Sequence, residues 1–189
     1  MRLRGSKRKF NYFTGDVEAT LAAIEAHYGG LQIEPTMAQL REMLSHPRFY
    51  EQPLAMVNFL KYYETAQYSS SDATDSAESG RAAYDRYSEN TMPHVYARGG
   101  RLLYAAKPEQ VIIGDQSSES SDNWDTVAIM EYPSRAAFFD MLLDPDYIAG
   151  IFHRDAGLKR TKVIASKTFY EPSNRLKAAM MRLMMWWRK

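Results

Sequence analysis

The sequence contains no cysteine among its 189 residues. This absence excludes disulfides, thiolate zinc sites, cysteine-ligated iron–sulfur clusters and a cysteine nucleophile. Long apolar runs are also missing, because the most apolar stretch, residues 178–187, is interrupted by Arg182. It does not approach the roughly 20 apolar residues that cross a bilayer. The basic start is also not followed by the apolar segment of a secretory signal, because Asp16 and Glu18 interrupt the sequence soon after it. We therefore expect a cytoplasmic protein that is not integral to a membrane.

Several catalytic and cofactor-binding motifs are absent as well. The sequence has no G-x-G-x-x-G, P-loop, G-x-S-x-G or H-E-x-x-H pattern, so nucleotide, serine hydrolase and zinc protease chemistry lack motif support. Its histidines are far apart and lack the spacing of a local metal site. These are His27, His46, His94 and His153. We expect neither a metal nor a cofactor.

The composition is that of a folded protein with one core: 45% of the residues are hydrophobic and 13% aromatic. Positive charge gathers at both ends, because residues 1–10 and residues 175–189 each hold five basic residues and no acidic one. The middle of the chain keeps 14 basic against 23 acidic residues. Basic ends raise the question of nucleic-acid binding, but an acidic body without a recognition element argues against it.

Changes of pattern divide the chain into four parts. Residues 1–15 form a basic arm, 16–52 a helical extension, 53–170 the main domain and 171–189 a tail. In the extension, helical periodicity predicts a helix over 16–28, and Thr36 with Gln39 forms a capping box for a second helix that ends before Pro47.

The residue pattern of the main domain predicts the order strand, helix, strand, strand, helix, strand. Strands are expected over 54–60, 101–113, 124–130 and 162–170, and a polar loop over 64–80. Pro93 should kink or divide the first helix, and Pro108 requires an edge position or a bulge in the second strand. The second helix, capped by Ser134, carries the apolar residues up to Leu142, and Pro145 starts a further turn. This order is typical of an α+β, ferredoxin-like βαββαβ sandwich.

Two of the expected strands, 54–60 and 124–130, are apolar on both faces. Helices of the same domain cover only one face of such a sheet. A second copy of the sheet would cover the other face, so we expect a homodimer.

Short segments spread over the main domain carry a resemblance to a known family. They are Met56–Lys61 (MVNFLK), Gly80–Tyr87 (GRAAYDRY), Gly99-Gly100, Trp124-Asp125, Glu131–Arg135 (EYPSR), Asp144–Tyr147 (DPDY), His153-Arg154 and Gly157-Leu158. In this order, over about residues 53–166, they resemble the family catalogued as domain of unknown function 1330. The resemblance implies the dimeric α/β-barrel superfamily, with a ferredoxin-like fold and face-to-face dimers. Cofactor-free monooxygenases, haem-dependent enzymes and small-molecule degradation proteins belong to that superfamily, but this family has no settled activity.

Candidate ligand-binding residues combine a polar amide with aromatic surface. Asn58 lies in the apolar first strand, where a buried amide needs hydrogen-bond partners, and Tyr84, Tyr104 and Trp124 supply aromatic rings with polar tips. With His153, they predict a pocket for a small organic molecule between sheet and helices. A closed pocket joining these residues would favour a small-molecule-binding protein or enzyme, whereas a shallow surface would favour a non-enzymatic interaction module.

Each candidate also has a structural interpretation. His153 could exchange protons as a catalytic residue, or be a histidine hydrogen-bonded at a helix end. Asn58 could orient a ligand or bond to a neighbouring loop. Arg135 starts a helix, where a cation is unfavourable, so it should pair with Glu131, with Asp125 or with a ligand carboxylate.

The tail predicts a basic amphipathic helix within residues 174–189. One interpretation is packing against the domain or its dimer mate, which Met181 and Met185 on the opposite face favour. The other is contact with an anionic membrane surface. The apolar face consists of Leu176, Ala179, Met180, Leu183, Met184 and Trp187.

Overall fold

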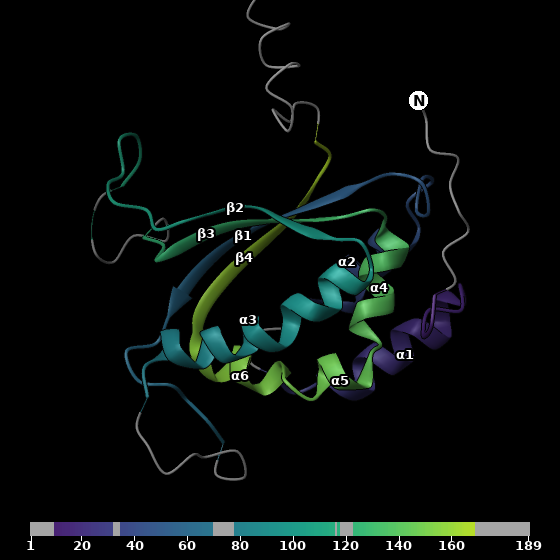
Figure 1. Cartoon of the computed structure of the whole chain (residues 1–189), viewed down its shortest axis with the longest axis horizontal. Helices are drawn as coiled ribbons and strands as arrows, with labels where there is room; N and C mark the ends of the chain where they lie inside the picture. Colours follow the sequence, from purple (N-terminus) through teal and green to yellow (C-terminus); the bar gives the residue numbers. More distant parts are fainter. Residues whose placement is uncertain (1–9, 32–34, 70–77, 116, 118–122, 169–189) are drawn as a thin grey trace, which may run out of the picture.

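The structure, a computed structural model, describes residues 10–31, 35–69, 78–115, 117 and 123–168 (Figure 1). The tail prediction and most of the basic arm lie outside these residues. The described elements are α1 (Val17–Tyr28), α2 (Met37–Leu44), β1 (Leu54–Tyr62), α3 (Gly80–Ala97), β2 (Arg101–Ala106), β3 (Thr126–Tyr132), α4 (Arg135–Leu142), α5 (Pro145–Ile148), α6 (Ile151–Gly157) and β4 (Leu158–Ser166).

The four described strands form one antiparallel sheet in the order β2-β3-β1-β4. β1 lies in the middle, and its Asn58 is opposite Ala128 of β3 on one side and Val163 of β4 on the other. Helices of the main domain connect the first strand to the second and the third to the fourth. This mixed α+β architecture agrees with the ferredoxin-like prediction.

Local sequence signals account for where several helices begin. At α2, Thr36 Oγ1 accepts from the Gln39 N–H, and Gln39 Oε1 accepts from the Thr36 N–H, so the predicted capping box is confirmed. Ser134 caps α4 by accepting from the Ala137 N–H. Pro145 occupies the first turn of α5, as predicted.

Several element boundaries differ from the sequence prediction. β1 extends to Tyr62, and β3 is Thr126–Tyr132 and not 124–130, so Trp124 precedes the strand. α3 is not divided at Pro93, because the helix on both sides of it is held by packing of Tyr87 and the fully buried Val95. β2 ends before Pro108 and lies at the sheet edge. β4 starts at Leu158, four residues earlier than expected, because charged residues that hid the strand are tolerated at the opposite edge.

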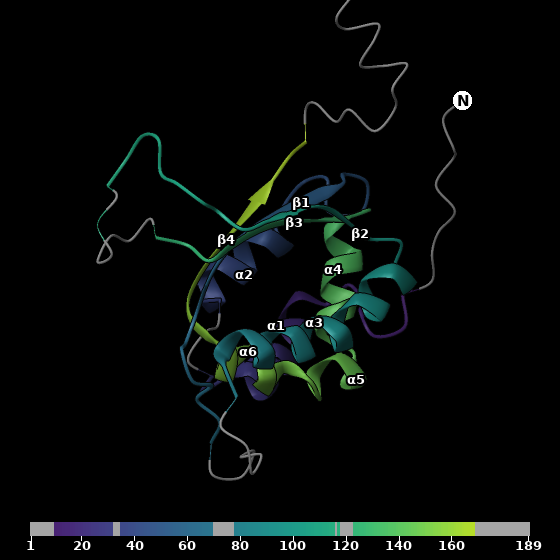
Figure 2. The same cartoon turned by 60° about the vertical axis from the view of Figure 1, so that its left-hand side comes forward.

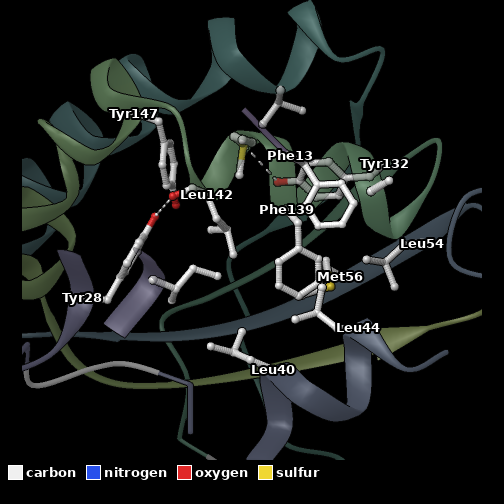
Figure 3. Packing of buried hydrophobic residues seen from close by; sticks show 14 of the residues in the cluster. Phe13, Tyr28, Leu40, Leu44, Leu54, Met56, Tyr132, Phe139, Leu142 and Tyr147 are labelled. Carbon is white, nitrogen blue, oxygen red and sulfur yellow. Dashed lines mark hydrogen bonds between the residues drawn. The ribbon is translucent and has the colours of Figure 1, made fainter. Parts of the chain in front are cut away.

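The N-terminal helices share one core with the sheet and the domain helices. Leu40 and Leu44 of α2, together with Phe13 before α1, belong to the same buried cluster as Met56 of β1 and Phe139 of α4 (Figure 3). Figure 3 shows the α2 leucines near Met56. Residues from the N-terminal helices thus fill space between the sheet and its helices.

A buried ion-pair network joins α3 to α4 and to the N-terminal segment. Arg98 Nε lies 2.8 Å from Asp140 Oδ2, and its Nη2 lies 2.9 Å from Asp144 Oδ2. Asp140 Oδ1 accepts from the backbone N–H groups of Tyr12 and Phe13, at 2.7 and 3.0 Å. Burial raises the pKa of Asp144, but bonds from Arg98, the Asp146 N–H and His94 leave it below the ordinary value. The Asp140 carboxylate thus ties the N-terminal segment to the domain.

The two faces of the sheet differ in cover. The helices lie on one side of it (Figures 1 and 2). Alternate residues of β1 project to opposite faces, so Met56, Asn58 and Leu60 face the helices. No described element covers the opposite face, which we call the open face. Its apolar residues, by strand register, are Val57, Phe59, Tyr104, Val127, Ile129 and Ile164.

Candidate active site

Two chain segments, residues 63–69 and 78–80, meet beside α6. The Ala66 N–H donates to the Glu78 carbonyl at 2.9 Å, and the Gln67 N–H donates to the Ala156 carbonyl at 2.8 Å. Tyr63 is bonded through its backbone to both Gly157 and Gly80. A Cβ at Gly80 would lie 2.5 Å from the Gly157 carbonyl oxygen, so glycine is needed for this approach. The contacts join the chain on either side of Tyr68 and Glu78 to the last residues of α6.

A hydrogen-bonded row of three side chains lies here, which we call the His153 triad. The Tyr68 hydroxyl lies 2.8 Å from Glu78 Oε1 and 2.7 Å from His153 Nδ1. A phenol has one proton to donate. Because the Glu78 carboxylate can only accept, Tyr68 donates to it, and Nδ1–H of His153 donates to Tyr68. The triad therefore sets the tautomer of the neutral imidazole, with the proton on Nδ1.

The charges around the triad keep Tyr68 a neutral donor. Burial and the Glu78 carboxylate raise the pKa of Tyr68 to about 12, so the phenol holds its proton at neutral pH. Arg86 Nη2 lies 3.1 Å from Glu78 Oε2 and balances the carboxylate charge. The imidazole of His153 also contacts an aromatic ring, because the Phe152 ring centroid lies 4.0 Å from its own. A histidine oriented in this way can take up a proton at Nε2.

The structure does not bring the other predicted residues to His153. Asn58 faces the helices, and its Nδ2 donates to the Met56 carbonyl at 2.8 Å and weakly to that of Ala128. It bonds within the sheet and not to a loop. Tyr84 packs 5.4 Å from the rings of both Tyr62 and Tyr87.

Trp124 and Tyr104 belong to the open face. The Trp124 ring lies 5.7 Å from Phe59, and the Arg160 guanidinium lies over it at 4.4 Å. Tyr104 is 53% exposed on the edge strand. Because neighbouring strand positions project to opposite faces, Asn58 and Trp124 cannot line one pocket between sheet and helices.

Arg135 pairs with neither of its expected protein partners. Glu131 pairs with Arg101 at 2.9 Å, and Asp125 pairs with Lys61 at 2.9 Å. Arg135 is nevertheless buried, with 9% of its surface exposed. Its ligand-binding role stays a prediction.

Sequence reasoning missed Tyr68 and Glu78. They stand ten residues apart within the polar segment 64–80 that was predicted as a loop, and Tyr68 is 85 positions from His153. No local periodicity joins positions so far apart. A weak signal was available, because an aromatic residue and a carboxylate flank a stretch otherwise rich in Ser, Asp and Ala.

Metal binding and membrane crossing find no support in the described part of the chain. Residues 10–31, 35–69, 78–115, 117 and 123–168 hold no group of three or more His, Asp or Glu residues that could bind a metal ion. Within the same residues, no helix is long and apolar enough to cross a membrane.

The architecture defines a small α+β protein with a four-stranded antiparallel sheet and helices on one face. Residues 75–168 match the family described as "Domain of unknown function (DUF1330)", and through this segment the chain belongs to that family. The resemblance seen in the sequence is thus confirmed over this range, although the β1 motif lies before it.

Two crystal structures of the RPA0582 protein resemble this fold. One, of the methylated protein, has a TM-score of 0.65 and covers 76% of this chain. The other, described as a protein of unknown function from Rhodopseudomonas palustris, has a TM-score of 0.63 and covers 74%. Both are 29% identical to this chain and are matched over 98% of their own length. No curated protein matches the chain.

Proposed function

We propose that the protein is an enzyme that moves a proton on a small organic molecule, with His153 as the proton acceptor. The observation that supports this is the bond from His153 Nδ1 to Tyr68, which is itself bonded to Glu78. A carboxylate, a hydroxyl and an imidazole in series orient the ring and stabilise the imidazolium that forms when Nε2 takes a proton.

The surroundings of His153 suit a small and partly apolar substrate. Phe152 and Tyr68 place their rings 4.0 and 5.6 Å from the imidazole, and all three residues are half-buried. Aromatic surface beside a titratable group is the usual composition of a small-molecule site. Transfer of a proton from carbon to Nε2 leaves a carbanion or enolate and requires no oxidant.

The test is hydrogen–deuterium exchange at carbon. The full chain is incubated in D₂O with a panel of small ketones, aldehydes and keto acids, and loss of the α-hydrogen signal is followed by ¹H NMR. We expect exchange with at least one compound. His153→Gln should reduce the exchange rate about 10²–10⁴-fold, the usual contribution of a general base.

Matched variants separate catalysis from folding. Tyr68→Phe removes the acceptor for Nδ1–H while keeping the ring, so the exchange rate should fall without loss of the folded state by circular dichroism. His27→Gln, on an exposed part of α1, should leave the rate unchanged. No exchange with any compound, or equal rates for wild type and His153→Gln, would refute the proposal.

We further propose that the chain forms a homodimer through the open face. The support is that this face carries apolar residues from all four strands, with Tyr104 53% and Ile164 41% exposed. An apolar sheet face of this kind is stabilised when a second copy covers it.

Ile129, in the middle of the open face, provides the test of the dimer. Ile129→Lys should give a monomer, because the two-fold symmetry places an unpaired charge in each half of the interface. Light scattering should give a dimer mass for wild type and for Lys159→Ala, which changes an exposed residue. A monomeric wild type at micromolar concentration would contradict the prediction.

The alternative function is a non-enzymatic interaction module that uses the open face for another protein. The same exposed Tyr104 and Ile164 favour it. It differs from the first proposal in its outcome: wild type would be monomeric, and the panel of carbonyl compounds would show no exchange. Membrane contact through residues 174–189 concerns a segment outside the described residues.

A further inference from the structure

Arg135 is a buried cation, and two of its guanidinium nitrogens lack an acceptor in the described part of the chain. It is 9% exposed, and neither its Nε nor its Nη1 bonds to any described residue. An unsatisfied buried N–H group is unfavourable, and more so when the group is charged. The backbone N–H of Arg135 donates to the Phe49 carbonyl at 3.2 Å, so this N–H group at the start of α4 already has an acceptor.

The imidazole of His46 is close enough to Arg135 to feel its charge. His46 feels the positive charges of both Arg135 and Arg48, and burial together with these charges lowers its pKa. The Arg48 N–H donates to His46 Nδ1 at 3.2 Å, which holds the imidazole in this position. Burial lowers the pKa of Arg135. We call His46, Arg48 and Arg135 the Arg135 cluster.

Nearby carboxylates are already paired with other cations. Glu131, four residues before Arg135, pairs with Arg101 on β2, and Asp140, on the same helix, pairs with Arg98. The positive end of α4 adds to the local potential. The Arg135 cluster holds two cations, Arg48 and Arg135, and no ion pair between described residues joins either of them to a carboxylate.

We propose that the Arg135 cluster binds an oxyanion, the carboxylate or phosphate group of a small molecule. Guanidinium groups bind such anions through two parallel N–H···O bonds. Rotation of the Arg135 side chain would present two N–H groups near the surface beside half-buried His46, and Arg48 would add a second cation. Arg135 lies at the start of α4 and His153 within α6, so this site does not rest on the proposed proton transfer.

The test follows His46 by NMR, using the full chain. The pKa of its imidazole is measured in sodium chloride, sodium phosphate and sodium acetate at equal ionic strength. A bound anion should raise the pKa of His46 relative to chloride, while His27, exposed on α1, should not respond. A response to phosphate alone assigns a phosphate group, and a response to acetate assigns a carboxylate.

Substitutions decide which residue binds the anion. Arg135→Met should abolish the His46 response and raise the melting temperature in chloride, because an unpaired buried charge is replaced by an apolar chain of similar length. Arg41→Met, which removes an exposed arginine of α2, should keep the response. If neither anion shifts His46, if Arg135→Met responds as wild type does, or if it melts lower in chloride, the proposal is overturned.

Discussion

Replacing Asp140 with alanine is expected to lower the free energy of unfolding by about 3–5 kcal/mol. Its carboxylate is 3% exposed and lies 2.8 Å from Arg98 Nε. Without it, a buried guanidinium loses one acceptor, and the backbone N–H groups of Tyr12 and Phe13 lose theirs. Urea denaturation followed by circular dichroism measures the effect.

An exposed ion pair provides the control for Asp140. Asp85 pairs with Arg81 one helical turn away, and both side chains are about half exposed. Asp85→Ala should cost only about 0.3–0.5 kcal/mol, because solvent screens such pairs. Similar losses for both variants would mean that the buried network contributes no more than a surface pair.

Phe139→Ala should have an effect of similar size, about 3–5 kcal/mol, because the side chain is fully buried and a cavity would remain. Its ring lies 6.2 Å from Phe13, 5.8 Å from Phe49 and 5.8 Å from Phe138. Two of these rings come from segments before β1, so the cavity would open between the N-terminal part and the domain (Figure 3). Denaturant midpoints of full-length protein measure the loss.

Ile113 serves as the matched control for the Phe139 substitution. It is 94% exposed, so Ile113→Ala removes apolar atoms without leaving a cavity. Its free energy of unfolding should stay within about 0.5 kcal/mol of wild type. A loss below about 1 kcal/mol for Phe139→Ala would show that the core collapses around the missing ring.

Local signals in the sequence predicted much of the fold. Thr36 and Gln39 lie three residues apart, and Ser134 lies three before Ala137. Short sequence patterns therefore predict the hydrogen bonds that begin these helices. Element order then indicated the sheet. The predicted element boundaries were wrong where tertiary packing outweighed local preference. At Pro93, for example, the helix continues because it buries Val95 and Tyr87.

The candidate site was less accessible to prediction. His153 was singled out, but its partners Tyr68 and Glu78 lie within the predicted loop 64–80 and meet it only through the fold. Asn58 and Trp124 were grouped by residue type, whereas Asn58 faces the helices and Trp124, which precedes β3, packs on Phe59 of the open face. Register between distant strands is a property of the sheet, and one strand's pattern does not contain it.

The four backbone bonds at the base of residues 64–79 bear on how this protein could diverge from its relatives. Once the base is closed, the entropy of closing the stretch above it grows only logarithmically, by about 0.6 kcal/mol for each doubling of length. Insertions and deletions between Ser69 and Glu78 should therefore be nearly neutral for stability. The positions of Tyr68 and Glu78 beside His153 are then held by the backbone bonds at the base and not by the length of the stretch above it.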